Sequence, residues 1–367
     1  MVSNRMNKVD ASGIRKVFDL AAKMTNPINL SIGQPDFDVP DPVKDAAIKA
    51  IQDGKNSYTQ TQGIPELHAE FRSYYKKQYD LELDQTLVTS GTSGGLFLAL
   101  MAIVNDGDEI LVTDPYFVMY KSLVSVFGGN PVYLDTYPDF RLRKDVLEAA
   151  LTSKTKAILL NSPANPTGYV YTTEELKMVA DFASAHDLLV LSDEIYDKFA
   201  FDGSTDTIAK YYDKVIIFNG LSKSCAMTGW RVGFVSGPEE IVNAMTMMQQ
   251  YSFVCAPSMA QYAGIAAMHY DSSALIQGYR TKRDIIYDGL KTEFNVVKPG
   301  GAFYIFPEAP GGNGMAFVER AIERNVLIIP GNVFSEQDTN FRISFATEDE
   351  ILKKGAEVLC ELAREFK

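Results

Sequence analysis

The amino-acid sequence predicts an α/β fold built on a mostly parallel, seven-stranded sheet within a three-layer α/β/α large domain. Seven short apolar runs alternate with longer helical patterns between residues 87 and 236. Near-continuous apolar strands separated by helices indicate a parallel sheet that is covered on both faces. The runs are Leu87–Thr89, Ile110–Val112, Val132–Leu134, Ala157–Leu160, Leu188–Leu191, Val215–Phe218 and Val232–Val235.

The stretches between these runs have helical periodicity, as Thr173–His186 illustrates. Its Leu176, Val179 and Ala183 recur at the spacing of one helix face. In open sheets of this kind, ligands bind in the crevice at the carboxyl ends of the strands. Functional residues are therefore expected where the strands end.

The C-terminal part of the chain has a different pattern. A long helical region at Ser258–Glu293 precedes short apolar runs and a helix near Met315–Arg324. A chain of 367 residues is long enough for two domains. We therefore predict a large domain at residues 38–261 and a smaller α+β domain that combines residues 1–37 with residues 262–367.

Composition and charge argue against several classes of function. The 47 Asp and Glu residues outnumber the 35 Lys and Arg residues, so the net charge is −12 and no nucleic-acid partner is expected. No apolar run approaches the roughly eighteen residues that a membrane span requires. The charged N-terminus does not resemble a signal peptide, and an odd number of cysteines argues against a disulfide framework, so we expect a cytoplasmic protein. The three histidines have no metal-ligand spacing, and no metal site is expected.

The segment Asn219–Phe234, NGLSKSCAMTGWRVGF, contains two cations and no acid. Its other residues are mostly glycine, small polar groups and apolar side chains, which are typical of a segment at least half buried. A buried cation requires a partner. Lys223 and Arg231 are therefore predicted to bind an anion or an electrophile that is not part of this segment.

Four further strand ends carry residues suited to a ligand. The small residues Thr89–Gly95 lead into a helix and could bind a phosphate through backbone N–H groups, or form only a tight turn. Asp193 could hold a cationic partner or only cap a helix. The loop NSPANPTG presents Asn161 or Asn165, although a plain turn explains it equally well, and Phe117 supplies an aromatic ring at the fourth end.

Taken together, these groups are the ones that pyridoxal 5′-phosphate requires. Its aldehyde reacts with a lysine to form a Schiff base. Its phosphate binds backbone N–H groups and a guanidinium. Its pyridine nitrogen requires a carboxylate, and its ring an aromatic face. The sequence therefore predicts a pyridoxal-phosphate site at the carboxyl edge of the sheet.

The sequence resembles the class I/II aminotransferases of the fold type I pyridoxal-phosphate enzymes. The resemblance runs from IGQPDF near the N-terminus to FRISFA near the C-terminus. Its most specific motif is SK-x-x-x-MTGWR-x-G, and NPTG followed by SDEIY at the family's distance supports it.

The resemblance implies a role for each residue around the cofactor ring. Lys223 is implied to form the Schiff base and then to move a proton between the substrate's Cα and the cofactor. Asp193 is implied to pair with the pyridinium nitrogen. Tyr196 and Asn165 are implied to hydrogen-bond the ring's 3′-oxygen, and Phe117 to stack on the ring.

The phosphate and the neighbouring subunit are assigned in the same way. Gly91, Thr92 and Ser93, together with Arg231, match the residues that hold the phosphate. Tyr58 matches the tyrosine that reaches the phosphate of the neighbouring subunit. The resemblance therefore implies a homodimer with shared active sites.

The substrate carboxylate is expected to bind Arg342, with Asn165 and Gly33 beside it. In a strand, Arg342 shares its face with the small Ser344 and Ala346, which leaves room for a bidentate carboxylate, although a surface ion pair fits the same pattern. Gly33 matches a glycine whose backbone approaches this carboxylate, because it has no side chain.

One position departs from the pattern of many relatives. They carry a serine three residues before the lysine, where its hydroxyl contacts the phosphate, and this chain has Gly220. Ser222 is the candidate for a substitute donor.

The implied reaction is ping-pong transamination between an L-amino acid and a 2-oxo acid, with 2-oxoglutarate the expected acceptor. Ser93 stands where some aspartate-specific relatives have a lysine, and Phe18, Ile32, Tyr58 and Phe117 are candidates for an apolar pocket. The expected donors are therefore aromatic or large neutral amino acids, then aspartate, then alanine. The alternatives are a carbon–sulfur β-lyase on the same scaffold and, more remotely, a non-catalytic cofactor-binding regulatory domain.

Overall fold

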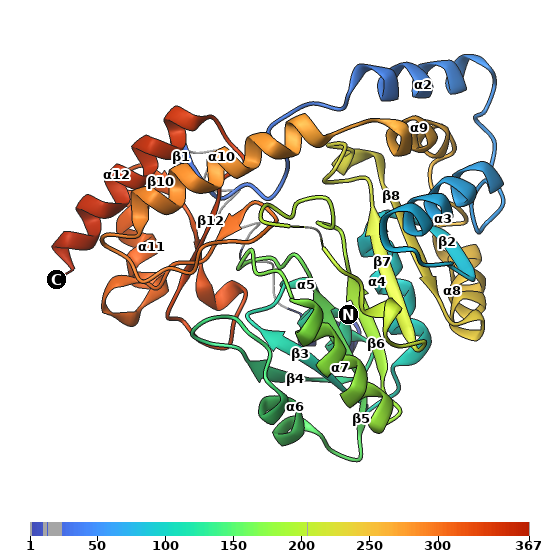
Figure 1. The fold of residues 1–367 in the computed structure, drawn as a ribbon, viewed down its shortest axis with the longest axis horizontal. Coiled ribbons are helices and arrows are strands. Elements are labelled where there is room, and N and C mark those ends of the chain that lie inside the picture. The colour runs from blue at the N-terminus through green and yellow to red at the C-terminus, as the bar shows by residue number, and fades with distance from the viewer. Residues whose placement is uncertain (1, 10–12, 14–23, 204, 367) are drawn as a thin grey trace.

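The computed structural model describes residues 2–9, 13, 24–203 and 205–366, and it confirms the predicted α/β fold. A seven-stranded sheet has the strand order β2-β8-β7-β6-β5-β3-β4 (Figure 1). Only β8 runs antiparallel to its neighbours, β2 and β7. The strands are β2 (Gln85–Ser90), β3 (Glu109–Asp114), β4 (Asn130–Asp135), β5 (Thr155–Asn161), β6 (Leu189–Asp193), β7 (Val215–Gly220) and β8 (Val232–Gly237).

Helices cover both faces of this sheet, because successive strand residues alternate between two apolar cores. Val88, Leu111 and Ile158 pack in a core with helices α2, α3, α6, α7 and α9. Their neighbours Leu87 and Ile110 pack in a core with α4, α5 and α8. These helices are α2 (Asp41–Gln52), α3 (Pro65–Tyr79), α4 (Gly91–Ile103), α5 (Met119–Val126), α6 (Lys144–Ala150), α7 (Thr173–Ala185), α8 (Glu239–Ser252) and α9 (Ser258–His269).

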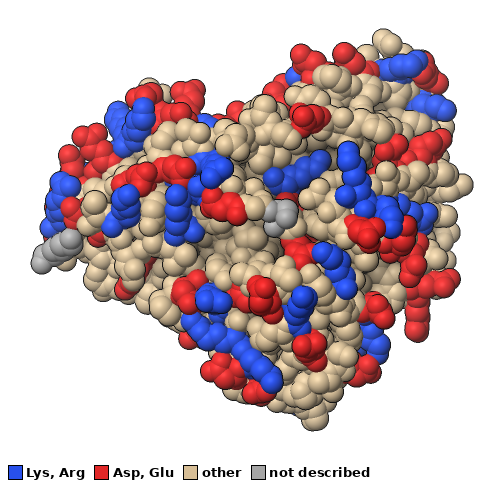
Figure 2. Space-filling view, viewed as in Figure 1, with Lys and Arg blue, Asp and Glu red and all other residues tan. Residues whose placement is uncertain are grey.

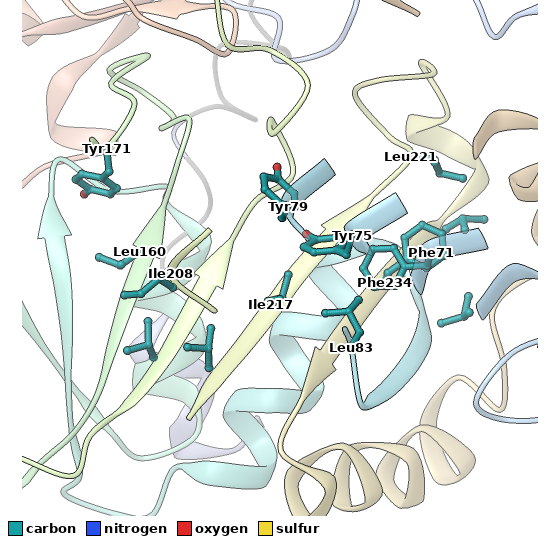
Figure 3. Close-up of a cluster of buried hydrophobic side chains, with 14 of the residues drawn as sticks. Phe71, Tyr75, Tyr79, Leu83, Leu160, Tyr171, Ile208, Ile217, Leu221 and Phe234 are labelled. Atoms are coloured by element: carbon teal, nitrogen blue, oxygen red, sulfur yellow. The ribbon is translucent and has the colours of Figure 1, made fainter. Parts of the chain in front are cut away.

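Aromatic side chains anchor α3 to the antiparallel end of the sheet. Phe71 of α3 stacks on Phe234 of β8, with ring centroids 4.5 Å apart. Figure 3 shows Tyr75 and Tyr79 continuing this row above Ile217 of β7. Strands β7 and β8 are thereby fixed from one side, and the segment that contains Lys223 connects these two strands.

A third core belongs to the C-terminal part of the chain, at the left of Figure 1. It includes Ile28 and Leu30 near the N-terminus, so the N-terminal segment packs with the C-terminal elements. A three-stranded antiparallel sheet has the order β11-β12-β9, and β1 pairs with β10 in parallel. The elements are β1 (Ile28–Asn29), β9 (Tyr304–Ile305), β10 (Val326–Leu327), β11 (Ile329–Pro330), β12 (Phe341–Ser344), α10 (Ser273–Leu290), α11 (Gly314–Glu323) and α12 (Asp349–Glu365).

The predicted helical region Ser258–Glu293 is two helices, which corrects the sequence-based expectation of one. The backbone is extended at Tyr270, and Asp271 Oδ1 accepts a hydrogen bond from the Ser273 backbone N–H at 2.9 Å, which forms a turn. Helix α9 packs in the core of the large sheet and α10 in the C-terminal core. The two-domain division stays a prediction, and we propose that its boundary lies at this turn rather than at residue 261.

The surface carries both signs of charge. Figure 2 shows basic and acidic side chains interspersed over one face of the molecule. Within the described residues, no helix is long and apolar enough to cross a bilayer. The same residues contain no group of three or more His, Cys, Asp or Glu side chains that could hold a metal ion.

Candidate active site

A cavity of about 260 Å³ lies where β5, β6 and β7 end and α4 begins. Side chains from the large sheet, the C-terminal part and the N-terminal segment all line it. It brings together every predicted site residue except Gly91 and Tyr58. The predicted residues that line it are Gly33, Thr92, Ser93, Phe117, Asn165, Asp193, Tyr196, Ser222, Lys223, Arg231 and Arg342.

One end of the cavity combines a helix N-terminus with a guanidinium. Helix α4 begins at Gly91, and the first N–H groups of a helix have no partner within the helix. A Cβ on Gly91 would lie 2.2 Å from Arg231 Nη2, so only glycine allows the guanidinium to pack against this helix start. Arg231 is held by hydrogen bonds to the carbonyls of Thr228 (2.8 Å) and Ser90 (3.2 Å). This end can bind a dianion such as a phosphate.

Gly220 leaves room for Thr92 at the same end of the cavity. A Cβ on Gly220 would lie 2.9 Å from Thr92 Oγ1 and 3.0 Å from the Val232 carbonyl oxygen. The Thr92 hydroxyl donates to the Asn219 carbonyl at 3.1 Å. A larger residue at 220 would therefore displace Thr92, and this local packing explains the glycine. Ser222 is buried and lines the cavity close to Lys223.

Lys223 lies in the middle of the site, where its side chain is partly buried. Its Nζ donates a hydrogen bond to the Gly33 carbonyl at 2.8 Å. Burial, with a smaller contribution from the positive charge of Arg342, lowers the pKa of the Lys223 amine to about 8, although Asp193 opposes the shift. Among the residues that the structure describes, no carboxylate forms an ion pair with this amine. An amine that loses its proton near neutral pH can act as a nucleophile and as a base.

Asp193 is the last residue of β6, and Tyr120 of α5 holds its carboxylate. The Tyr120 hydroxyl donates to Asp193 Oδ2 at 2.7 Å, and the Ile195 N–H donates to Oδ1 at 3.2 Å. Burial raises the pKa of Asp193 to about 6, while these hydrogen bonds and the charge of Lys223 act in the opposite direction. The carboxylate is thus poised to receive a cationic partner inside the cavity.

A row of polar groups connects the NPTG loop to the C-terminal strands. Asn165 Oδ1 accepts a hydrogen bond from Arg342 Nη1 at 3.0 Å, which leaves the amide nitrogen of Asn165 free to donate. The hydroxyls of Tyr196 and Tyr304 are 2.9 Å apart. A Cβ on Gly33 would lie 2.9 Å from the Tyr304 hydroxyl, so this backbone approaches the row only as glycine.

Arg342 is a buried guanidinium with a free edge. Tyr304 and Phe334 lie on it, each ring centroid 4.5 Å from Cζ. Nη2 donates to the Ser31 carbonyl at 3.0 Å, whereas Nε is buried without a hydrogen-bond partner. A buried donor without a partner is costly, and a bound carboxylate would satisfy it. Arg342 is therefore not the surface ion pair that the sequence alone left open.

Two of the predicted residues lie outside the cavity lining. Gly91 contacts it only through Arg231. Tyr58, in the loop after α2, is 82% exposed and does not line the cavity of its own chain. Phe18 lies outside the described residues. Ile32 and Phe117 do line the cavity, and Phe117 packs edge-on against Tyr120 at 5.6 Å.

Sequence reasoning missed Tyr120 and Tyr304. Tyr120 lies one helical turn after Phe117, and only the packing of α5 against the large sheet brings its hydroxyl to Asp193. Tyr304 lies in the run GGAFYIFPE, which gave no sign that its hydroxyl would meet Tyr196. Their spacing to the other site residues carries no local motif, so only the fold identifies them.

The residues present fit pyridoxal phosphate. The glycine-dependent contact of Arg231 with the start of α4 suits the phosphate, and the buried Asp193 suits a pyridinium nitrogen. Lys223 suits the aldehyde, and the unpartnered Nε of Arg342 suits a substrate carboxylate at the opposite end.

Comparisons with known proteins agree with this arrangement. The chain is 38% identical over 375 residues to a probable aspartate aminotransferase of Methanocaldococcus jannaschii, covering 99% of this chain and 100% of the relative. It is 37% identical to aromatic-amino-acid aminotransferase 2 of Thermococcus litoralis, covering 100% and 99% of the two chains. The structure of Thermus thermophilus aspartate aminotransferase with maleate superposes with a TM-score of 0.95 at 32% identity, covering 99% of each chain.

The family model described as aminotransferase class I and II matches residues 25–359. Members of this family use pyridoxal phosphate. The chain belongs to the class I and II aminotransferases, and it is a pyridoxal-phosphate-dependent enzyme of that family.

Proposed function

We propose that the enzyme transfers the α-amino group of an L-amino acid to a 2-oxo acid, with 2-oxoglutarate as the acceptor, by a ping-pong mechanism. The observation that carries this proposal is the pairing of Lys223 and Arg342 in one cavity. Arg342 is buried and Lys223 is partly buried, and neither forms an ion pair with a carboxylate among the described residues. Such an arrangement binds an anion at one point and presents a weakly basic amine at another.

Several residues would hold the cofactor in this proposal. Arg231, with Thr92 and Ser93 at the start of α4, would bind the phosphate. Asp193 would pair with the ring nitrogen, and Tyr196 would donate to the ring's hydroxyl oxygen, as would Asn165, while Phe117 would stack on the ring. Ser222 would add a hydroxyl near the phosphate, and Lys223 would hold the cofactor covalently through Nζ.

When bound, pyridoxal phosphate supplies an electron sink for the charge left on the substrate's α-carbon after its proton is removed. Lys223 takes that proton at Nζ and releases it again later in the amino-group transfer. Desolvation lowers the pKa of its amine toward the pH at which it must act. Asp193 remains ionised through its hydrogen bonds and thereby stabilises positive charge on its partner.

Arg342 orients the substrate in this proposal. A planar guanidinium binds a carboxylate through two parallel hydrogen bonds, and the two flanking rings fix its plane. Asn165 restrains Nη1, and Gly33 provides a backbone surface beside the bound group. Fixing the carboxylate directs the α-proton toward Lys223, which is catalysis by proximity and orientation.

We propose that aromatic or other large neutral amino acids are the preferred donors, ahead of aspartate and alanine. Ile32, Leu96 and Phe117 give the cavity an apolar lining. Beyond Lys223, Arg231 and Arg342, no Lys or Arg among the described residues lines it. An acidic side chain would therefore need an arginine from a partner subunit, and relatives named for both aspartate and aromatic amino acids are known.

A screen of single half-reactions tests this ranking. Each of the twenty amino acids is mixed with the cofactor-loaded enzyme without an oxo acid, and the rate of oxo-acid release is measured. We expect phenylalanine, tyrosine and leucine to react at least about tenfold faster than alanine, because each buried methylene contributes about 0.8 kcal/mol. Aspartate as the fastest donor would contradict the assignment of an apolar pocket while leaving the aminotransferase itself unaffected.

Replacing Tyr120 with phenylalanine is expected to weaken cofactor binding at acid pH. The hydroxyl of Tyr120 lowers the pKa of Asp193, so its loss raises a pKa that is already about 6. A carboxyl with a higher pKa is neutral over a wider acid range and cannot pair with the ring nitrogen there. The dissociation constant of pyridoxal phosphate is measured by titration between pH 5 and pH 8. It should rise as the pH falls in both proteins, and the rise should begin at a higher pH in the variant than in the unaltered enzyme. If the rise begins at the same pH in both proteins, Tyr120 does not lower the pKa of Asp193.

We further propose that the enzyme is a homodimer with shared sites. Tyr58 is exposed and remote from its own cavity, which suits a residue that reaches the phosphate bound by a partner. Large apolar side chains are also exposed on α4, α8 and the turn that follows α8, namely Met101, Met247, Tyr251 and Phe253. Burial of such side chains against a second copy would stabilise a dimer. We also propose a cytoplasmic location, and the absence of a disulfide at Cys225 and Cys255 agrees with it.

A further inference from the structure

The loop that carries Tyr58 is tied down by side chains from α8 and α9. Ser258 Oγ donates to the Lys55 carbonyl at 2.7 Å. Gln261 Oε1 accepts the Ile64 N–H at 2.9 Å, and its Nε2 donates to Thr59 Oγ1 at 2.9 Å. Contacts on both sides of Tyr58 therefore come from the first turn of a single helix, α9.

Gln249 of α8 adds a second tie to the same loop. Its Nε2 donates to the Thr61 carbonyl at 2.6 Å and to the Val88 carbonyl of β2 at 2.9 Å. The Val88 N–H in turn donates to the Gln62 carbonyl at 2.8 Å, which joins the loop to the sheet. The loop is thus held by hydrogen bonds against β2, the strand that leads into the phosphate end of the site.

Both glutamines are completely buried, with exposed fractions of 0%. Burying an amide side chain is costly unless its hydrogen bonds are satisfied. Apart from the Ala256 carbonyl that Gln261 also contacts, the bonds of these two amides go to this loop and the adjoining strand, and Gln249 Oε1 has no hydrogen-bond partner among the described residues. Two buried amides from two helices, directed at one loop, fix the backbone there more firmly than apolar packing would.

Within the described part of the chain, the Tyr58 hydroxyl forms no hydrogen bond that would explain such a restraint. Tyr58 is 82% exposed, so its ring is directed by the backbone on either side of it. Fixing that backbone fixes the position of the Tyr58 ring. Because the ring is exposed, its position matters little for packing within the chain and matters most for a molecule that the ring contacts outside it. We therefore expect the restrained loop to serve a contact between Tyr58 and a second chain.

Helix α9 also contacts the segment around Lys223 of its own chain. A Cβ on Gly264 would lie 3.3 Å from Leu221 Cδ1, and the Cys225 thiol donates to the Ala267 carbonyl at 3.6 Å. A change in α9 could consequently act on the site of its own chain or on that of a partner. An experiment must separate these two routes.

We propose that Gln249 and Gln261 are positioning residues that hold Tyr58 in place for the phosphate bound by the partner subunit. This inference rests on the proposed homodimer with shared sites. It predicts that the effect of changing either glutamine appears in the partner's site and not in the site of the altered chain.

Heterodimers with one functional lysine test this prediction. Two differently tagged chains are expressed together and the mixed dimer is purified, with Lys223→Ala in one chain, so that only the other chain can fix the cofactor to Lys223. In the first arrangement, Gln261→Leu is in the chain that carries Lys223→Ala. In the second, Gln261→Leu is in the chain that keeps Lys223. Bound pyridoxal phosphate is titrated, fixed to Lys223 by borohydride and counted by mass spectrometry.

We expect the cofactor's dissociation constant to rise roughly tenfold in the first arrangement, the loss of about one hydrogen bond to a charged group. In the second arrangement it should equal that of the dimer without the glutamine change. Equal weakening in both arrangements, or weakening only in the second, would overturn the proposal, because α9 would then act on the site of its own chain.

Tyr58→Phe in the same two arrangements separates this inference from the proposed function. It should weaken binding in the first arrangement only. If Tyr58→Phe weakens cofactor binding and Gln261→Leu does not, only the role of the glutamine is overturned. If Tyr58→Phe leaves cofactor binding unchanged in both arrangements, the shared site is overturned as well. If Gln261→Leu prevents dimer assembly, Ser258→Ala, which removes only the bond to Lys55, is compared in its place with the melting temperature of the cofactor-free dimer as a control.

Discussion

Replacing Lys223 with alanine is expected to lower the rate of amino-group transfer by roughly 10²- to 10⁴-fold, the range expected for a lost general base. The alanine side chain can neither hold the cofactor covalently nor take a proton from the substrate. The variant should still bind pyridoxal phosphate, since Arg231, Asp193 and the start of α4 remain. Steady-state rates and the bound cofactor per chain are the measurements.

Two controls accompany this variant. Lys214→Ala removes an exposed lysine that is paired with Asp187, and it should leave the rate unchanged. Adding a small primary amine should restore part of the activity of the Lys223→Ala enzyme, because a free base can then enter the vacated space. Substantial turnover by that variant without any added amine would remove Lys223 from the mechanism.

Replacing Arg342 with glutamine is expected to reduce kcat/KM about 100-fold or more for every amino-acid donor. Removing one partner of a buried charge pair costs about 2–5 kcal/mol, and here the pair forms only when the substrate carboxylate binds. The loss should be similar for apolar and acidic donors, since the α-carboxylate is common to both. Arg342→Lys should recover only part of it, because an ammonium cannot form two parallel bonds.

Arg283 provides the matched comparison. It is as buried as Arg342, with exposed fractions of 1% for both, but it forms ion pairs with Asp202 and Asp284. Removing Arg283 breaks an ion pair of each of these acids and should lower the melting temperature of the cofactor-free protein, whereas Arg342→Gln should lower it less. Equal destabilisation, with kcat/KM unaffected by Arg342→Gln, would show that Arg342 is structural.

The main sheet could be predicted from the sequence because each of its strands is a local apolar run. All seven runs lie in the strands of the large sheet, and only Leu188 falls one residue outside its strand. The break between α9 and α10 could not be predicted, because no proline or glycine marks it. It depends on a turn at Asp271 and on two cores that only the folded chain defines.

The candidate site divides in the same way. Lys223, Asp193 and Arg231 belong to strand ends and turns with a recognisable local pattern, so the sequence could indicate them. Tyr120, Tyr304 and the two loop-binding glutamines act through hydrogen bonds to residues between 73 and 202 positions away in the chain. No spacing rule connects such distant positions, and the packing of helices on the sheet alone brings them together.

The most direct test of the account is the stoichiometry of a single half-reaction. The cofactor-loaded enzyme is mixed with an excess of its best L-amino acid without any oxo acid, and oxo acid and ammonia are both counted. We predict one oxo acid per site, no ammonia, and a halt that ends only when 2-oxoglutarate is added. Continued release of oxo acid and ammonia beyond one equivalent per site would contradict amino-group transfer and indicate an eliminating enzyme such as a β-lyase.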